Sequence, residues 1–287
     1  MEYALLACSL SAGIAKNLLS KSANKNASAF GDLMNINLLI ALFGIVVFIF
    51  GNTFRIDGSP LLFLLLALFY GLMTIGSQTF FMFAVQSGEV SVCSIIYSAN
   101  FIIPTVFAVL AYHDPISVCK AIGIGMICAA IILVSQPGSN RRTVKSIVFA
   151  LLAMLCSAGV GIIQKVFAHE FGNGQSTTFL FYAFLFMFVV AFILKAVTLR
   201  APALKAEGHL KQNILAKILL AFCVVLANKL NMYLSAALPA TILFPILNGG
   251  TVVFSAICSI ILFKDRVTVR KLIALPVTVA AIVLFAF

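Results

Sequence analysis

The feature that most constrains this chain is a succession of apolar runs, each about long enough to cross a lipid bilayer. A spanning helix needs about 20 mainly apolar residues, and the sequence contains ten such runs. Most links between them are short, so neighbouring runs are predicted to form antiparallel hairpins. The runs are Tyr3–Ser20, Leu33–Phe50, Leu61–Gln86, Val90–Tyr112, Ile116–Ser135, Lys145–Ala168, Ser176–Leu199, Gln212–Ser235, Leu238–Phe263 and Thr268–Phe287.

The low charge content excludes a soluble globular protein. Only 9% of the 287 residues are charged and 63% are hydrophobic, whereas soluble domains carry about 25% charged residues. The first run follows Met1-Glu2 without a basic segment, so it is interpreted as a membrane helix and not as a cleaved signal peptide. The sequence therefore predicts an all-α, multi-pass protein of ten transmembrane helices, with the lipid bilayer as its surroundings.

The second half of the chain repeats the first. Residues 77–136 align without a gap on residues 228–287, and this places Asp114 on Asp265 and Lys120 on Lys271. Each half holds five runs, and because five is odd the second half enters the membrane from the opposite side. Such an inverted-topology repeat is typical of transporters. The two predicted five-helix repeats are residues 1–137 and 141–287.

Basic residues predict the orientation. Fifteen Lys and Arg fall on one predicted face, and only Arg55, Lys120 and Lys165 on the other. The positive-inside rule makes the richer face cytoplasmic, so both termini are predicted to be extracellular, in a plasma or inner membrane. This bias accounts for the net charge of +11. The basic links lack interleaved aromatic residues, so no nucleic-acid partner is expected.

One segment carries a family resemblance. It is LPATILFPILNGGTVVFSAICSIILFKDRVTVRKLIALPVTVAAIVLF, from Leu238 to Phe285, with its FP, its NGG, an acidic helix end and a basic restart. With the ten runs and the repeat, it resembles the drug/metabolite transporter superfamily, in its EamA-type branch. The resemblance implies a carrier that works by alternating access, in a family that moves amino acids, other metabolites, drugs or sugar nucleotides.

Two features depart from relatives in that superfamily. Sugar-nucleotide carriers usually have cytoplasmic termini, and the small four-helix members have an essential glutamate midway along their first helix, where this chain has Gly13. All acidic residues lie at predicted helix ends or in links, so no carboxylate-driven proton antiport is expected. These residues are Glu2, Asp32, Asp57, Glu89, Asp114, Glu170, Glu207 and Asp265.

Lys229, within VVLANKLNMYLSAALP, is the one basic residue that neither face accommodates. It lies past the middle of its run, too far from the cytoplasmic end for easy snorkelling. An ionisable residue inside a membrane usually marks a functional site. Asn228 and Asn231 share the neighbouring helix face, and the three could hold a carboxylate or phosphate. The structural alternative is a lysine that reaches the outer interface or bonds backbone carbonyls.

The repeat supplies partners for Lys229. Its equivalent in the first half is the polar Gln78. By the same alignment, the pair Tyr97 and Asn100, spaced i, i+3, matches the pair Asn248 and Thr251. These pairs should face each other between the halves, where such carriers bind substrate; the alternative is interhelical hydrogen bonding, worth about 0.6 kcal/mol each. The predicted substrate-binding residues are Lys229, Asn228, Asn231, Gln78, Tyr97, Asn100, Asn248 and Thr251.

Two further polar pairs and three prolines complete the candidates. Lys16-Asn17 and Gln164-Lys165 lie nearer an interface and are interpreted as snorkelling. The prolines interrupt apolar runs, where they free backbone carbonyls, and bends are expected there. They are Pro104, Pro245 and Pro276.

No catalytic residues, metal or cofactor are predicted. The seven cysteines form no metal-binding spacing, the three histidines lie apart, and no nucleophile–base set is visible. The sequence thus predicts a secondary active or exchange transporter, not an enzyme, for a small polar metabolite that is amino acid-like, anionic or zwitterionic. One alternative is a multidrug exporter with a pocket made from the 27 phenylalanines, which we expect instead to face lipid. The other is a non-transporting structural or lipid flippase-like protein; a monomer or a homodimer is expected.

Overall fold

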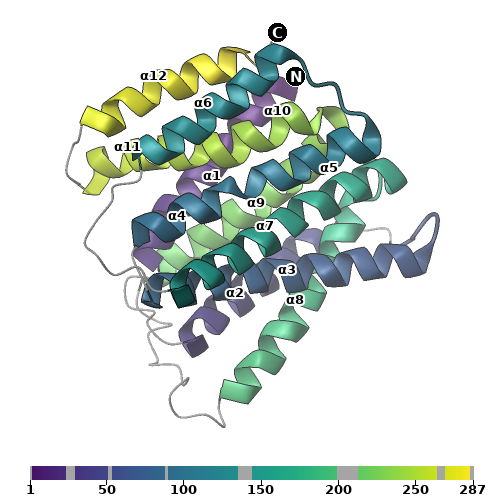
Figure 1. Cartoon of the computed structure of the whole chain (residues 1–287). Coiled ribbons are helices and arrows are strands. Elements are labelled where there is room, and N and C mark those ends of the chain that lie inside the picture. The colour runs from purple at the N-terminus through teal and green to yellow at the C-terminus, as the bar shows by residue number, and fades with distance from the viewer. Residues whose placement is uncertain are drawn as a thin grey trace.

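The computed structural model describes residues 2–23, 30–50, 54–87, 90–134, 144–198, 213–263 and 269–284. These residues are largely helical, no strand occurs among them, and the helices run side by side in one bundle (Figure 1). The elements are α1 (Glu2–Ala23), α2 (Phe30–Ile49), α3 (Pro60–Ser87), α4 (Val90–Ser98), the 3-10 helix η1 (Ala99–Phe101), α5 (Ile102–Tyr112), α6 (Val118–Val134), α7 (Val144–Phe171), α8 (Ser176–Thr198), α9 (Ile214–Ala237), α10 (Ala240–Phe244), the π-helix η4 (Pro245–Gly250), α11 (Thr251–Phe263) and α12 (Val269–Leu284).

The ten predicted runs correspond to ten helical spans in this part of the chain. Eight are single helices, the fourth consists of α4, η1 and α5, and the ninth of α10, η4 and α11. Six of the helices are long and apolar enough to cross a membrane, and the remaining spans contain shorter apolar helices. The predicted all-α, ten-helix membrane protein is confirmed.

The packing partners of the helices follow the repeat. The third span of each half packs on the first span of the other, as α3 on α7 and α9 on α1. The equivalent second spans, α2 and α8, pack together, and so do the fifth spans, α6 and α12, which lie along one edge of the bundle (Figure 1). These reciprocal pairings are those of two inverted halves. The division between residues 137 and 141 lies outside the described residues and stays a prediction.

The fourth span of each half is interrupted by a segment that is not α-helical. Pro104 follows η1 and Pro245 opens η4, and each proline lacks the N–H that would close an α-helical hydrogen bond. Irregular backbone at membrane depth is tolerated where protein buries it, and η1 packs against η4. The backbone departs from α-helical geometry just before Pro104 and at Pro245, whereas α12 continues as a helix through Pro276. Bends at these prolines stay a prediction.

An aromatic cluster fills one end of the bundle, where α3 begins, α7 ends and α8 begins. Phe63 meets Phe167, Phe171 and Phe179 edge-to-face, with ring centroids 5.7, 5.3 and 5.7 Å away, a favoured geometry for aromatic pairs. Three of these rings, Phe63, Phe167 and Phe179, have no exposed surface. The expectation that the phenylalanines face lipid is therefore wrong for this cluster, which instead packs the core.

Candidate substrate-binding site

Asn228 and Asn231, which were predicted to share a face of α9, form hydrogen bonds to helices of the first half. The Tyr70 hydroxyl on α3 donates a hydrogen bond to Asn228 Oδ1. Gln164 Nε2 on α7 donates a hydrogen bond to the Tyr70 hydroxyl oxygen, at a distance of 3.2 Å. Asn228 Nδ2 donates to the carbonyl of Val224 at 2.8 Å. Buried polar groups are almost always hydrogen-bonded, and here these bonds fix the position of the Asn228 amide.

The same face of α9 also contacts the first helix, α1. Ser9 on α1 donates its hydroxyl to Asn231 Oδ1, and Ser235 donates to the Asn231 carbonyl at 2.7 Å. We refer to the side chains that meet here as the central polar network. It combines α1 and α3 of the first half with α7 and α9 of the second, and its members are Ser9, Tyr70, Gln164, Asn228 and Asn231.

Lys229 turns to a different neighbour. Its ammonium donates to Ser176 Oγ at 2.8 Å and to Thr177 Oγ1 at 2.6 Å, both in the first turn of α8. No carboxylate forms an ion pair with Lys229 among the described residues. A positive ammonium therefore lies at the positive end of the α8 dipole, a combination that favours an anion.

Tyr97 and Asn100, the polar pair of the first half, lie among the helices and form hydrogen bonds there. The Tyr97 hydroxyl is 3.2 Å from Ser77 Oγ, and Asn100 Nδ2 donates to Ser157 Oγ at 2.8 Å. Asn100 Oδ1 is buried and has no hydrogen-bond partner in the described structure. An unsatisfied buried acceptor costs about 1–3 kcal/mol, but this oxygen is enclosed, so a polar ligand would reach it only if the surrounding helices moved.

Asn248 and Thr251 form the polar pair of the second half, on η4 and at the start of α11. Asn248, on η4, is half-buried, and Thr251 donates its hydroxyl to the Leu247 carbonyl. Because η1 and η4 pack together, Asn100 and Asn248 belong to segments in contact. Gln78 is half-buried on α3. The hydrogen bonds described for Lys229 go to α8 and not to this group, so the structure distributes the predicted residues over two places.

Sequence reasoning missed part of the central polar network. Gln164 was expected to snorkel, but it is only 5% exposed and bonded to Tyr70, so that interpretation is wrong. Tyr70 and Ser9 were not predicted. One signal could have found Tyr70, because it precedes Ser77 by seven residues, two helical turns, and therefore shares its face of α3.

The neighbouring Lys165 also has a specific partner instead of snorkelling. Its ammonium is 2.9 Å from Asp114 Oδ2, and the two side chains are 11% and 12% exposed. Asp114 Oδ2 also accepts the backbone N–H of Ala240 at 2.6 Å, and Thr241 donates to the Pro115 carbonyl at 3.0 Å. These contacts, which we call the Asp114 clamp, tie the α5–α6 link of the first half to α7 and α10 of the second.

Other functional chemistry is sparse in the described residues. No three His, Cys, Asp or Glu side chains come together there to form a metal-binding group. None of the seven cysteines forms a disulfide in the described part of the chain. Asp32 is buried in the first turn of α2, where it interacts electrostatically with Lys217 of α9. The central polar network itself consists of hydroxyls and amides.

Comparisons with known proteins place this architecture. The model of the EamA-like transporter family matches residues 3–136, which span the first five membrane helices. A solved crystal structure superposes with a TM-score of 0.71 over 97% of this chain and 96% of that chain at 14% identity, and therefore shares its fold. A comparison with curated proteins gave no match. Over residues 3–136, just under half of its length, the chain is thus similar to the EamA-like transporter family, whose members are membrane transporters of the drug/metabolite superfamily.

Proposed function

We propose that this protein is a secondary active or exchange carrier that moves a small polar metabolite across the cell membrane by alternating access. The proposed substrate is amino acid-like and anionic or zwitterionic. The observation that supports it is Lys229, an ammonium within a membrane span that two hydroxyls hold and that has no carboxylate partner among the described residues. A charge in this setting is costly and is usually kept for function.

The geometry around Lys229 suits a carboxylate. An ammonium and the hydroxyls of Ser176 and Thr177 converge, and charge-assisted hydrogen bonds of this kind are about twice as strong as neutral ones. The preceding residue, Asn228, belongs to the central polar network, so amide and hydroxyl groups lie next to the cation along α9. Those neutral groups would bind the other polar groups of the substrate.

The multidrug alternative has less support. An open drug pocket needs exposed aromatic surface, but Phe63, Phe167 and Phe179 pack against one another without exposed surface. The hydrogen-bonded side chains between the halves are more suitable for a polar solute. A liposome flux assay with a panel of amino acids, other organic anions and hydrophobic cations distinguishes these classes, and uptake of the hydrophobic compounds alone would contradict the proposal.

Lys229→Met tests the proposed site directly. This substitution keeps most of the bulk and removes the charge, so we expect a folded protein whose affinity for the anionic substrate falls at least tenfold, since a hydrogen bond to a charged group contributes about 1.5–3 kcal/mol. Substrate affinity is measured by titration calorimetry or by half-saturation of flux. The matched control is Lys16→Met, an exposed lysine on α1. Unchanged affinity in a well-folded Lys229→Met protein would return the lysine to a structural role.

The proposed orientation, with both termini outside, rests on the bias of basic residues. The seven native cysteines are first replaced, and one cysteine is added after Phe287. We expect a membrane-impermeant thiol reagent to label it on intact cells, because the positive-inside rule places the lysine-rich links in the cytoplasm. Labelling that requires permeabilised cells would reverse the orientation.

A further inference from the structure

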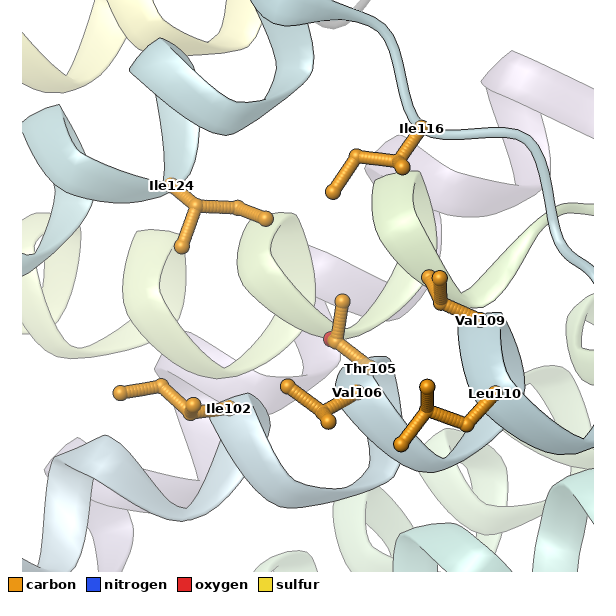
Figure 2. Close-up of a pocket in the computed structure, with 7 residues that line it drawn as sticks. All are labelled: Ile102, Thr105, Val106, Val109, Leu110, Ile116 and Ile124. Carbon is orange, nitrogen blue, oxygen red and sulfur yellow. The ribbon is translucent and has the colours of Figure 1, made fainter.

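A groove between α5 and α6 has no part in the site described above. Figure 2 shows its seven lining residues, which come from α5, from the α5–α6 link and from α6, around a volume of about 140 Å³. The single polar member, Thr105, donates its hydroxyl to the Phe101 carbonyl at 2.8 Å. The lining therefore offers hydrocarbon surface only. It consists of Ile102, Thr105, Val106, Val109, Leu110, Ile116 and Ile124.

The groove arises from the way the two helices pack. α5 packs on α7 and α10, whereas α6 packs on η4, α11 and α12. The two helices are neighbours in sequence but lean on different partners, and the ribbon of the ninth span crosses behind the gap between them in Figure 2. The groove thus follows from the packing of the first half on the second and does not depend on a single side chain.

The surroundings identify the chemical class of the occupant. The rim residues Leu110 and Ile116 are 73% and 49% exposed, in helices that cross a bilayer, where the neighbouring molecules are lipids. Lys120 lies near the α5–α6 link, which forms one end of the groove. It is four residues before Ile124 on α6, and Ile116 lies in the link just before this helix, whose first turn includes the bond from Ala121 N–H to the Ser117 carbonyl. Residues with this spacing share a helix face.

We propose that the groove binds a phospholipid, with one acyl chain along the lining residues and the phosphate at Lys120. The exposed His113, which ends α5, lies at the same end of the groove. Lys120 has no ion pair among the described residues, so its ammonium is available to the phosphate. One lysine near a membrane surface favours anionic lipid by about fivefold, and the site should prefer phosphatidylglycerol to phosphatidylcholine by that factor.

The absence of tryptophan from the sequence makes the site measurable. Leu110→Trp places a single fluorophore at the rim, and Val279→Trp places one on α12, at a position 45% exposed with no lysine or arginine within a helical turn. Both variants are reconstituted in bilayers containing a small fraction of phosphatidylglycerol or phosphatidylcholine with brominated acyl chains, which quench tryptophan on contact. Equal melting temperatures establish that both are folded.

We expect brominated phosphatidylglycerol to quench Leu110→Trp with an apparent affinity about fivefold higher than brominated phosphatidylcholine. The two lipids should quench Val279→Trp equally, and adding Lys120→Gln to Leu110→Trp should abolish the preference. Equal quenching of Leu110→Trp by both lipids would overturn the proposal, and so would a preference that survives Lys120→Gln. Absence of quenching of Leu110→Trp by both lipids would also overturn it, because the groove would then be covered by protein, such as a second copy of the chain.

Discussion

Asp114→Asn is expected to lower the free energy of unfolding by about 3 kcal/mol, because it leaves the ammonium of Lys165 without its partner in a largely buried place. Asparagine retains an oxygen that can accept the Ala240 N–H, so the loss reports mainly on the ion pair. The free energy of unfolding is measured by denaturant titration in a single detergent in which unfolding is reversible. The size of the effect comes from desolvation, since a charge that remains buried and unpaired costs more than the pair contributes.

Two comparisons make this prediction specific. The double variant Asp114→Asn with Lys165→Met should be more stable than Asp114→Asn alone, because no unpaired charge remains. Arg55→Gln removes one partner of an exposed ion pair, with side chains 81% and 61% exposed and 2.8 Å apart, and should change stability by no more than about 1 kcal/mol. If the double variant is no more stable than Asp114→Asn, the clamp is not held by its ion pair.

Gly71→Ala is expected to cost about 3 kcal/mol, at the upper end for overpacking. A Cβ at Gly71 would lie 2.9 Å from the backbone nitrogen of Met187 and 3.1 Å from the carbonyl oxygen of Ala183, both on α8. Backbone atoms cannot rotate away as side chains can, so relief requires α3 and α8 to separate. Small residues commonly allow such close approach between membrane helices.

Gly125→Ala is the matched control on α6. A Cβ there would have no atom within 4 Å, and alanine favours a helix over glycine by about 1 kcal/mol. This variant should therefore be as stable as the parent or slightly more so. Both glycine variants are compared by thermal unfolding and by the fraction that elutes as a single folded species. Equal behaviour of Gly71→Ala and Gly125→Ala would show that α3 and α8 are not in backbone contact.

The sequence predicted the spans, their breaks and their inverted pairing because each of these depends on local or periodic properties. Apolar length defines a spanning helix, and a proline lacks its N–H in any context, so the breaks near Pro104 and Pro245 could be placed beforehand. The repeat relates the two halves by chemistry as well as by length, through coincidences such as Asp114 with Asp265.

The partners of the polar residues could not be predicted in the same way. Tyr70 and Asn228 are separated by 158 positions, and their hydrogen bond depends on how α3 crosses α9. Lys229 was recognised because neither face accommodated it, but its bonds to Ser176 and Thr177 depend on the relative depth of α8 and α9. For Gln164 the error came from judging depth by distance from the helix end, although packing against α3 buries it.

The Asp114 clamp has a consequence for the kinetics of the proposed transport cycle. One carboxylate oxygen holds both Lys165 and the Ala240 N–H, and the same link accepts Thr241. If the halves part at that end, these bonds break together, so opening there is a concerted, all-or-none event. Because all of these contacts must be lost before that end opens, the clamp disfavours the open state of the empty carrier. The empty carrier would then rarely leak through that end, and the Asp114→Asn carrier would leak more often.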